Sequence, residues 1–370
     1  MPSVNPLPLE DVTIVDLSTL LPGPLATLYL AEAGARVIKV ERPPDGDEIR
    51  MFPPLSGDSS AAFALLNRGK ESISADLKSS AGRARVLTLL GDADILVEQF
   101  RPGVLARLGL GADVLQQINP RLIICSITGF GQTGPRAAEA GHDLTYMAAS
   151  GLLSLACGTD GAPVVPATLN ADIAGGSWPA VMNILLALRQ RDRTGQGMHL
   201  DISMAENLFP FAFLELARGF AGDWPAGGDG LLTGGSPRYN IYRTADDRFL
   251  AAAPLEQRFW DLFCDLTGVP DSLRDDASDP AATKAAVATL VAARTAADWQ
   301  ERFAGQDVCC AVVASLQEAV ADPAFAARNL FGRSVTDTLG NCLPALPLPL
   351  DFALRDDRQK VDCPGLEKSG

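Results

Sequence analysis

Two stretches of the sequence place acid–base side chains at the start of an apolar helical pattern. The first, EAGHDLTYMAASG at residues 139–151, contains His142 and Asp143, and His142 is one of only two histidines in the chain. The second, NADIAGGSWPAVMNILLAL at residues 170–188, contains Asp172. Imidazole is the side chain best suited to proton transfer near neutral pH, and carboxyl groups are common proton carriers. The residue types therefore predict proton-transfer chemistry.

Each of these residues also has a purely structural interpretation. A histidine can be hydrogen-bonded into a core or face solvent, and both aspartates are acceptable helix N-caps. A helix beginning at Asp143 would leave N–H groups unpaired, and these could stabilise an enolate oxygen. We expect Gly175 and Gly176 to leave room for a ligand beside Asp172. Spacing alone leaves both interpretations of Asp172 open.

The elements that must position these residues alternate between strands and helices. Residues 12–17 and 35–41 are typical of buried strands, and the helical pattern between them stops at Gly34. Further strands are expected at 93–99 and 121–129, with a helix over 77–92. This order predicts an α/β fold, with a large doubly wound Rossmann-like domain.

A nicotinamide dinucleotide site is disfavoured in this predicted domain. Glu41 ends the second strand, where such a site would hold a ribose. The first turn, however, has one glycine, Gly23, between two prolines, so it lacks the glycines that let a backbone approach a pyrophosphate.

Composition divides the chain into four segments. We expect the large domain at 1–190, a helical linker at 191–226 and a smaller α+β domain at 227–325, with a hairpin near 240–253. Residues 326–370 contain LPALPLPLDF, whose prolines predict an extended segment rather than a central strand or helix.

The overall totals exclude several classes of protein. A net charge of −14 argues against a nucleic-acid partner, and we expect no apolar stretch long enough to cross a membrane. The N-terminus lacks the regions of a signal peptide, and the seven cysteines show no ligand spacing. The sequence therefore predicts a cytoplasmic protein without a metal.

Ordered motifs along almost the whole chain resemble the family III CoA-transferases, and within them the α-methylacyl-CoA racemases. The motifs are LEDVTIVDLSTLLPGPLAT, GARVIKVERP, LNRGKESISADLKS, FRPGVLARLGLG, ITGFGQTGP, AGHDLTYMAASGLL, NADIAGGS, RTGQGMHLDISM and GGSPRYNIYRTADDRFLAAAPLEQRFW. The resemblance implies an acyl-CoA substrate, no cofactor beyond the CoA of that substrate, and an interlocked homodimer. It also implies that residues 326–370 return to the large domain.

The resemblance assigns roles to individual residues. His142 and Asp172 become opposed proton carriers at the α-carbon of a 2-methyl-branched thioester, and Glu256 orients the histidine. The enolate oxygen would lie against the N–H of Asp143. The residues implied in CoA binding are Arg42, Ala75, Asp76, Leu77, Lys78, Arg101, Arg107, Gly141, Asp143 and Tyr146.

Two other functions remain open. In a CoA-transferase of the same family, Asp172 would be a nucleophile that forms an acyl anhydride and then an enzyme thioester. In a non-catalytic acyl-CoA binder, the fold would be kept without proton exchange.

Overall fold

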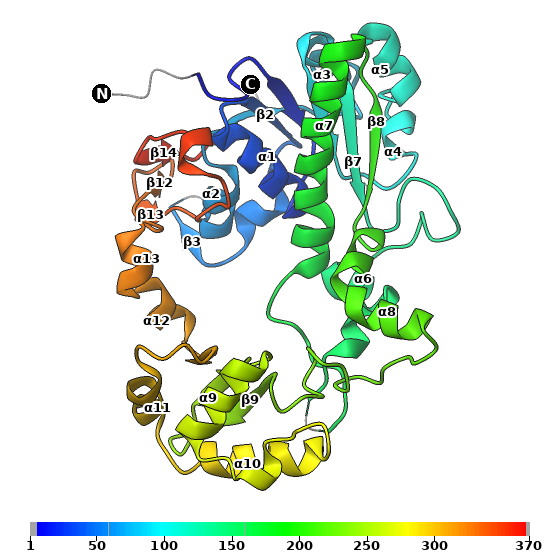
Figure 1. Cartoon of the computed structure of the whole chain (residues 1–370). Coiled ribbons are helices and arrows are strands. Elements are labelled where there is room, and N and C mark those ends of the chain that lie inside the picture. The colour runs from blue at the N-terminus through cyan, green and yellow to red at the C-terminus, as the bar shows by residue number, and fades with distance from the viewer. Residues whose placement is uncertain (1–5, 58, 159, 368–370) are drawn as a thin grey trace. The chain divides into compact units, whose positions relative to one another are not determined.

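The computed structural model describes residues 6–57, 59–158 and 160–367 (Figure 1). The chain forms two compact units. The larger unit comprises residues up to 150, residues 167–210 and residues from 323 onward, and the smaller comprises 151–166 and 211–322.

The larger unit is built on a six-stranded parallel sheet. Its strands are β1 (Thr13–Asp16), β2 (Arg36–Glu41), β5 (Glu71–Ser74), β6 (Ile95–Glu98), β7 (Ile123–Thr128) and β8 (His199–Ser203). Their order is β5-β2-β1-β6-β7-β8, and every neighbouring pair is parallel. The predicted α/β class is confirmed. The strands are mostly apolar runs because both faces of a parallel sheet are covered by helices.

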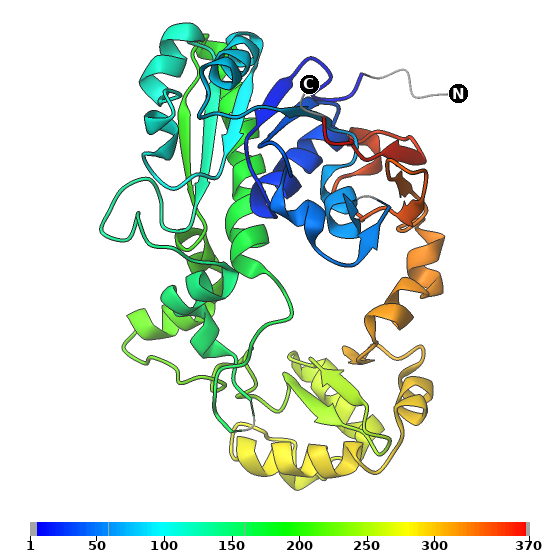
Figure 2. The same cartoon turned by 180° about the vertical axis from the view of Figure 1, so that it is seen from behind.

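Helices pack on both faces of this sheet. On one face, α3 (Ser80–Asp92) and α5 (Ala112–Ile118) bury Leu90 and Leu115 against Leu96 of β6. α7 (Trp178–Thr194) packs along β7 and β8 and also contacts α1 (Pro22–Glu32) (Figures 1 and 2). The remaining α-helices of the unit are α2 (Ala61–Asn67), α4 (Val104–Arg107), α6 (Asp143–Ala149) and α13 (Pro323–Ala327).

Smaller elements complete the larger unit. They are 3₁₀ helices η1 (Glu48–Met51) and η6 (Phe352–Leu354), the π-helix η3 (Asn170–Ser177), the strand pair β3 (Leu55–Ser56) and β4 (Ser59–Ser60), and a second sheet of β12 (Ser334–Thr336), β13 (Cys342–Pro344) and β14 (Lys360–Asp362). The 3₁₀ helix η4 (Glu206–Ala212) runs to the start of the smaller unit.

Two expectations about segments need correction. Residues 191–203 are not part of a linker, because α7 continues to Thr194 and β8 pairs with β7 as the edge strand of the sheet. The C-terminal segment is not extended throughout, because it contributes β12, β13 and β14 and buries Ala345 and Leu348.

The expectation that no stretch could cross a membrane was also wrong on length and composition. One helical stretch in the described part of the chain, Asn170–Thr194, reaches a mean hydropathy of 1.3. Its α7 portion buries Ile184, Ala187 and Leu188, so one side of this helix is interior surface of the unit. The absence of a membrane partner stays a prediction.

The smaller unit has a three-stranded antiparallel sheet and its own core. The sheet has the order β11 (Cys310–Val312), β10 (Phe249–Ala252), β9 (Asn240–Arg243), and the predicted hairpin is the β9–β10 pair. Trp260 and Phe263 of α9 (Gln257–Thr267) and Trp299 of α11 (Ala296–Phe303) are buried in its core. The other helices are η2 (Leu152–Leu155), α8 (Phe213–Phe220), η5 (Asp271–Leu273), α10 (Pro280–Val291) and α12 (Leu316–Val320).

Candidate active site

A cavity of about 530 Å³ opens in the larger unit at the carboxyl ends of four strands. Its walls include Leu20 after β1, Arg101 after β6, Thr128 at the end of β7 and Met204 after β8. The strands β1 and β6 are neighbours at the centre of the sheet, where the order of the chain reverses. Ligands of open parallel sheets bind outside the carboxyl ends at this position, so the fold itself marks the cavity as the site.

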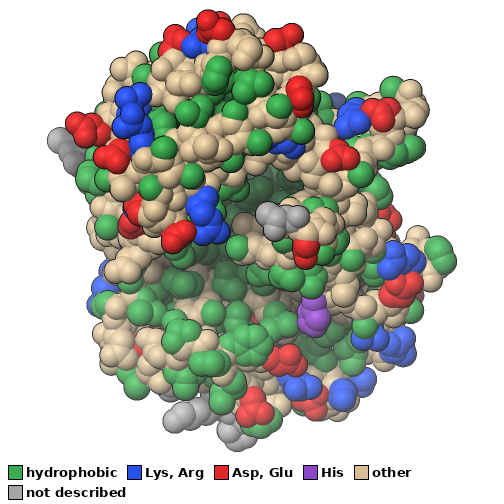
Figure 3. Space-filling view, turned by 90° about the horizontal axis from the view of Figure 1, so that it is seen from below, with side chains coloured by type: hydrophobic (Ala, Val, Ile, Leu, Met, Phe, Trp, Pro, Cys, Tyr) green, Lys and Arg blue, Asp and Glu red, His purple; other side chains and the backbone are tan. Residues whose placement is uncertain are grey.

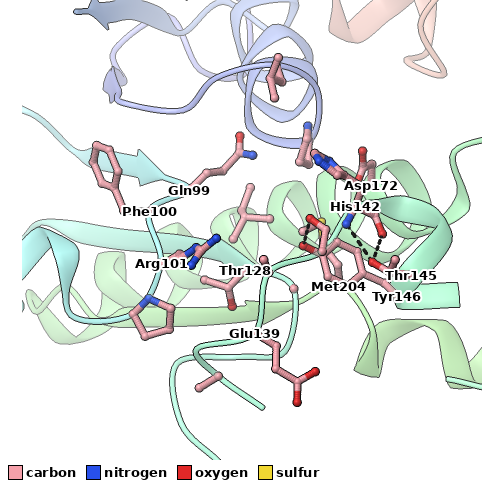
Figure 4. Close-up of a pocket in the computed structure, with 18 of the residues that line it drawn as sticks. Gln99, Phe100, Arg101, Thr128, Glu139, His142, Thr145, Tyr146, Asp172 and Met204 are labelled. Carbon is pink, nitrogen blue, oxygen red and sulfur yellow. Dashed lines mark hydrogen bonds between the residues drawn. The ribbon is translucent and has the colours of Figure 1, made fainter. Parts of the chain in front are cut away.

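His142 and Asp172 both line this cavity (Figure 4). His142 is the N-cap of α6, with an extended backbone, and its imidazole is exposed. The Thr145 hydroxyl accepts the His142 N–H at 2.9 Å and donates to the His142 carbonyl at 2.8 Å. These two bonds fix the backbone that carries the imidazole.

Asp172 lies in the π-helix Asn170–Ser177. Single turns of π-helix are rare and often occur at functional sites. The glycines after Asp172 do not leave room for a ligand as expected. A Cβ at Gly175 would lie 2.4 Å from the Met204 carbonyl oxygen, so this glycine allows the π-helix to pack against the chain after β8.

The buried Asp143 joins the two candidate proton carriers. It is the first residue of α6 rather than its N-cap, and its carboxylate accepts the Asp172 N–H at 2.9 Å. The structural interpretation of Asp143 as a helix cap is therefore corrected. Its side chain ties α6 to the π-helix, and thereby fixes where His142 and Asp172 lie relative to one another.

The surroundings of Asp172 favour its protonated form. Burial is the largest cause and the neighbouring Asp143 carboxylate the second, while His142 opposes them; together they raise the pKa of Asp172 from 3.8 to about 6. Carboxyl groups with raised pKa values in a cavity are candidates for acid–base catalysis.

Tyr146 packs tightly between two glycines beside these groups. A Cβ at Gly129 or Gly141 would lie 2.3 or 2.4 Å from its ring, so neither position has space for a side chain. The Tyr146 hydroxyl donates to the Gly141 carbonyl at 2.7 Å. Burial raises the pKa of Tyr146, and the Asp172 charge raises it further. Gly141 and Tyr146 both line the cavity, and their role as substrate contacts stays a prediction.

The start of α1 reaches the cavity, but its first three residues, Pro22–Pro24, have no free N–H group to offer a phosphate. Pro22 and Pro24 have no N–H, and the Gly23 N–H donates to the Gln99 side chain at 2.8 Å. A pyrophosphate bound as in a dinucleotide fold would need these donors. Glu41 is also engaged, because its carboxylate pairs with Arg50 at 2.7 Å. The absence of a nicotinamide site stays a prediction.

Four exposed cations predicted to bind CoA follow strands of the same sheet at its carboxyl edge. They are Arg42 after β2, Lys78 after β5, and Arg101 and Arg107 after β6. Among the described residues, none of them forms an ion pair. In a chain of net charge −14, unpaired cations along one edge suit an anionic ligand.

Of the predicted CoA-binding residues, several do not reach the cavity wall. Arg101, Gly141 and Tyr146 do, but Arg42, Ala75, Asp76, Leu77, Lys78, Arg107 and Asp143 do not. Ala75 is buried in the core, Leu77 packs on that core, and the Asp76 carboxylate accepts the Lys78 N–H at 2.9 Å. The role of these residues in CoA binding stays a prediction.

Glu256 belongs to the smaller unit, where it is the exposed N-cap residue of α9. Its role as the residue that orients His142 stays a prediction. Sequence reasoning missed Thr145 and Gln99. A threonine three positions after an N-cap could have indicated the first, but nothing local indicates that Gln99 meets Gly23.

Fold and cavity together define an α/β protein with a candidate acid–base pair, His142 and Asp172, at the carboxyl edge of a parallel sheet. The chain belongs to CoA-transferase family III, whose family model matches residues 9–369. This confirms the family expected from the motifs.

Its relatives include enzymes of two reaction types. The chain is 37% identical to human alpha-methylacyl-CoA racemase over 317 residues, 84% of this chain and 79% of that protein. It is 34% identical to acetyl-CoA:oxalate CoA-transferase of Acetobacter aceti over 377 aligned positions, gaps included, which cover 98% of this chain and 94% of that protein. A crystal structure of a CAIB/BAIF family protein from Brucella suis matches with a TM-score of 0.83 at 30% identity, covering 98% of this chain and 97% of that one.

Proposed function

We propose that this protein is a racemase that inverts the α-carbon of 2-methyl-branched acyl-CoA thioesters. The observation that carries the proposal is one cavity lined by both His142 and Asp172, whose supporting elements are joined through Asp143. Inversion through an enolate needs a proton acceptor on one face of the carbon and a proton donor on the other.

The reaction requires only two proton transfers. One carrier removes the α-proton, and the electron pair of the C–H bond moves into the enolate. The other carrier, already protonated, delivers a proton to the opposite face, and the two exchange roles for the reverse direction. A pKa of about 6 lets Asp172 serve as base or acid near neutral pH. The enolate oxygen would accept from the Asp143 N–H, which has no acceptor within the described residues.

The proposal includes a homodimer, interlocked as the resemblance implies. Apolar side chains are frequent on the surface seen in Figure 3, and α7 exposes Trp178, Met182 and Leu186. Exposed apolar residues gathered on one helix are typical of a protein interface. Glu256 would then orient His142 either within one chain or across the dimer.

A CoA-transferase is the second candidate, supported by the match to the Acetobacter enzyme over nearly the whole chain. In this reaction an Asp172 oxygen attacks the thioester carbonyl, the C–S bond breaks, and CoA leaves as its thiolate with an acyl anhydride left on the enzyme. Transfer to a free carboxylic acid would follow through an enzyme thioester.

One experiment separates the candidates. A single epimer of 2-methylbutanoyl-CoA is incubated with the protein in heavy water, with and without a free carboxylic acid. Deuterium at the α-carbon together with loss of configuration supports the racemase. Transfer of CoA to the added acid, with release of 2-methylbutanoate and an enzyme thioester trapped by hydroxylamine, supports the transferase instead. An ester that is bound but unchanged would mean a binding protein.

A further inference from the structure

Leu20 holds an unusual backbone conformation in the wall of the cavity. Its φ is 61°, in the left-handed region, and Leu20 and Thr19 both line the cavity after β1. A residue with a Cβ rarely adopts this region, because the Cβ comes too close to the following carbonyl oxygen. Something in the surrounding structure must therefore hold Leu20 in place.

Lys39 and Asp47 hold the backbone on both sides of Thr19. The Lys39 ammonium donates to the Ser18 carbonyl at 2.8 Å, and the Asp47 carboxylate accepts the Leu20 N–H at 3.1 Å. The two side chains pair with each other at 2.8 Å, and both are completely buried. One ion pair thus binds the Ser18 carbonyl and the Leu20 N–H, the two backbone groups that flank Thr19.

The pair is itself anchored to rigid structure. Lys39 lies inside β2, a central strand of the sheet. The Asp47 N–H donates to Glu41 at the end of the same strand at 2.9 Å, and its carboxylate caps η1 by accepting the Ile49 N–H at 3.1 Å. The ion pair therefore holds the cavity-wall segment Ser18–Leu20 at a fixed position relative to β2.

We propose that Lys39 and Asp47 are positioning residues that keep the segment Ser18–Leu20 in the conformation that binds the substrate. A buried ion pair is weak evidence for stability, because apolar residues of similar volume usually replace it without loss. Its two hydrogen bonds to a strained loop give it a second role. The inference rests on the proposed acyl-CoA binding, but not on whether the reaction is racemisation or transfer.

The test is a cycle that combines Lys39→Met/Asp47→Leu with Leu20→Gly. Glycine adopts the left-handed region without penalty, so a chain with Gly at position 20 has little strain to release when the pair is removed. We expect the replaced pair to weaken binding of racemic 2-methylbutanoyl-CoA about tenfold when Leu20 is present, and less than about threefold in the Leu20→Gly chain. Titration calorimetry measures both.

A matched control replaces a different buried ion pair. Arg68 and Glu32 pair at 2.8 Å, Glu32 also pairs with Arg333, and neither Arg68 nor Glu32 lines the cavity. Arg68→Met/Glu32→Gln should leave binding unchanged in both backgrounds. An equal loss of affinity with and without Leu20→Gly, or no loss at all, would overturn the positioning role.

Hydrogen exchange gives a second readout that needs no ligand. Amides of the peptide 17–24 should exchange faster in Lys39→Met/Asp47→Leu than in the unaltered protein, and unchanged exchange would contradict the inference. If that variant does not fold, Asp47→Ala, which removes the acceptor of the Leu20 N–H, replaces it in both measurements. A lack of acyl-CoA binding by the unaltered protein would refute the proposed function, while the exchange result would still decide the role of the pair.

Discussion

Replacing Asp143 by asparagine tests the electrostatics of the site. The rise in the pKa of Asp172 from 3.8 to about 6 corresponds to about 3 kcal/mol against the ionised form. Asp143→Asn removes a negative charge and keeps an oxygen that can accept the Asp172 N–H. The pKa of Asp172 should fall, because the nearby charge that opposes ionisation is gone. It should stay above 3.8, because burial is the larger cause.

The assay is the pH dependence of kcat/KM for α-hydrogen exchange, measured separately for each epimer. The epimer whose proton is removed by Asp172 needs the carboxylate ionised, so its rate should decline as pH falls through about 6 in the unaltered protein. In Asp143→Asn this decline should move to lower pH. Asp113→Asn, in the first turn of α5, is the control and should move nothing. A decline that stays in place or moves to higher pH would refute this account of Asp172.

Three other outcomes follow from the packing and the charges. Gly141→Ala places a Cβ against the Tyr146 ring, so kcat/KM should fall at least about tenfold and stability should fall by about 1–3 kcal/mol. Gly91→Ala within α3 is the control and should be stabilising by about 0.5–1 kcal/mol. Thermal unfolding and rate assays compare the two variants. Burial raises the pKa of Glu98 from 4.5 to about 7, so about 3 kcal/mol of stability present below pH 4.5 should be lost as pH rises through 7. Urea unfolding at about pH 5 and 8 should show this loss of stability, and Glu98→Gln should remove it. Glu256→Gln should lower the exchange rate and leave the dissociation constant for acyl-CoA unchanged; an unchanged rate would exclude Glu256 from the site.

Local patterns predicted the elements of the sheet well. The predicted strands 93–99 and 121–129 became β6 and β7, because strands covered on both faces are predominantly apolar. The residues of β8 resemble a strand, but its place at the edge of the sheet depends on pairing with β7 after a crossover through α6 and α7. A helical linker at 191–226 was therefore predicted where the sheet has its edge.

The acid–base residues were predictable, but their arrangement was not. His142 and Asp172 stand out by type and by family resemblance, and the cavity contains both. The bond from the Asp172 N–H to Asp143 joins residues 29 positions apart, and that from Gly23 to Gln99 joins residues 76 apart. Such contacts are set by tertiary packing, and the segments involved contain no local signal for them.

The pattern of exchange in two variants tests the two-carrier mechanism most directly. His142→Ala and Asp172→Asn are each incubated in heavy water with each pure epimer of 2-methylbutanoyl-CoA, and α-deuterium and configuration are followed by NMR and chiral analysis. Each variant should fail to racemise, yet exchange the α-hydrogen of one epimer only. The epimer whose α-hydrogen still exchanges should differ between the two variants, because each variant keeps the proton carrier on one face only. Exchange of the α-hydrogen of the same epimer by both variants, or continued racemisation by either, would contradict opposed proton carriers.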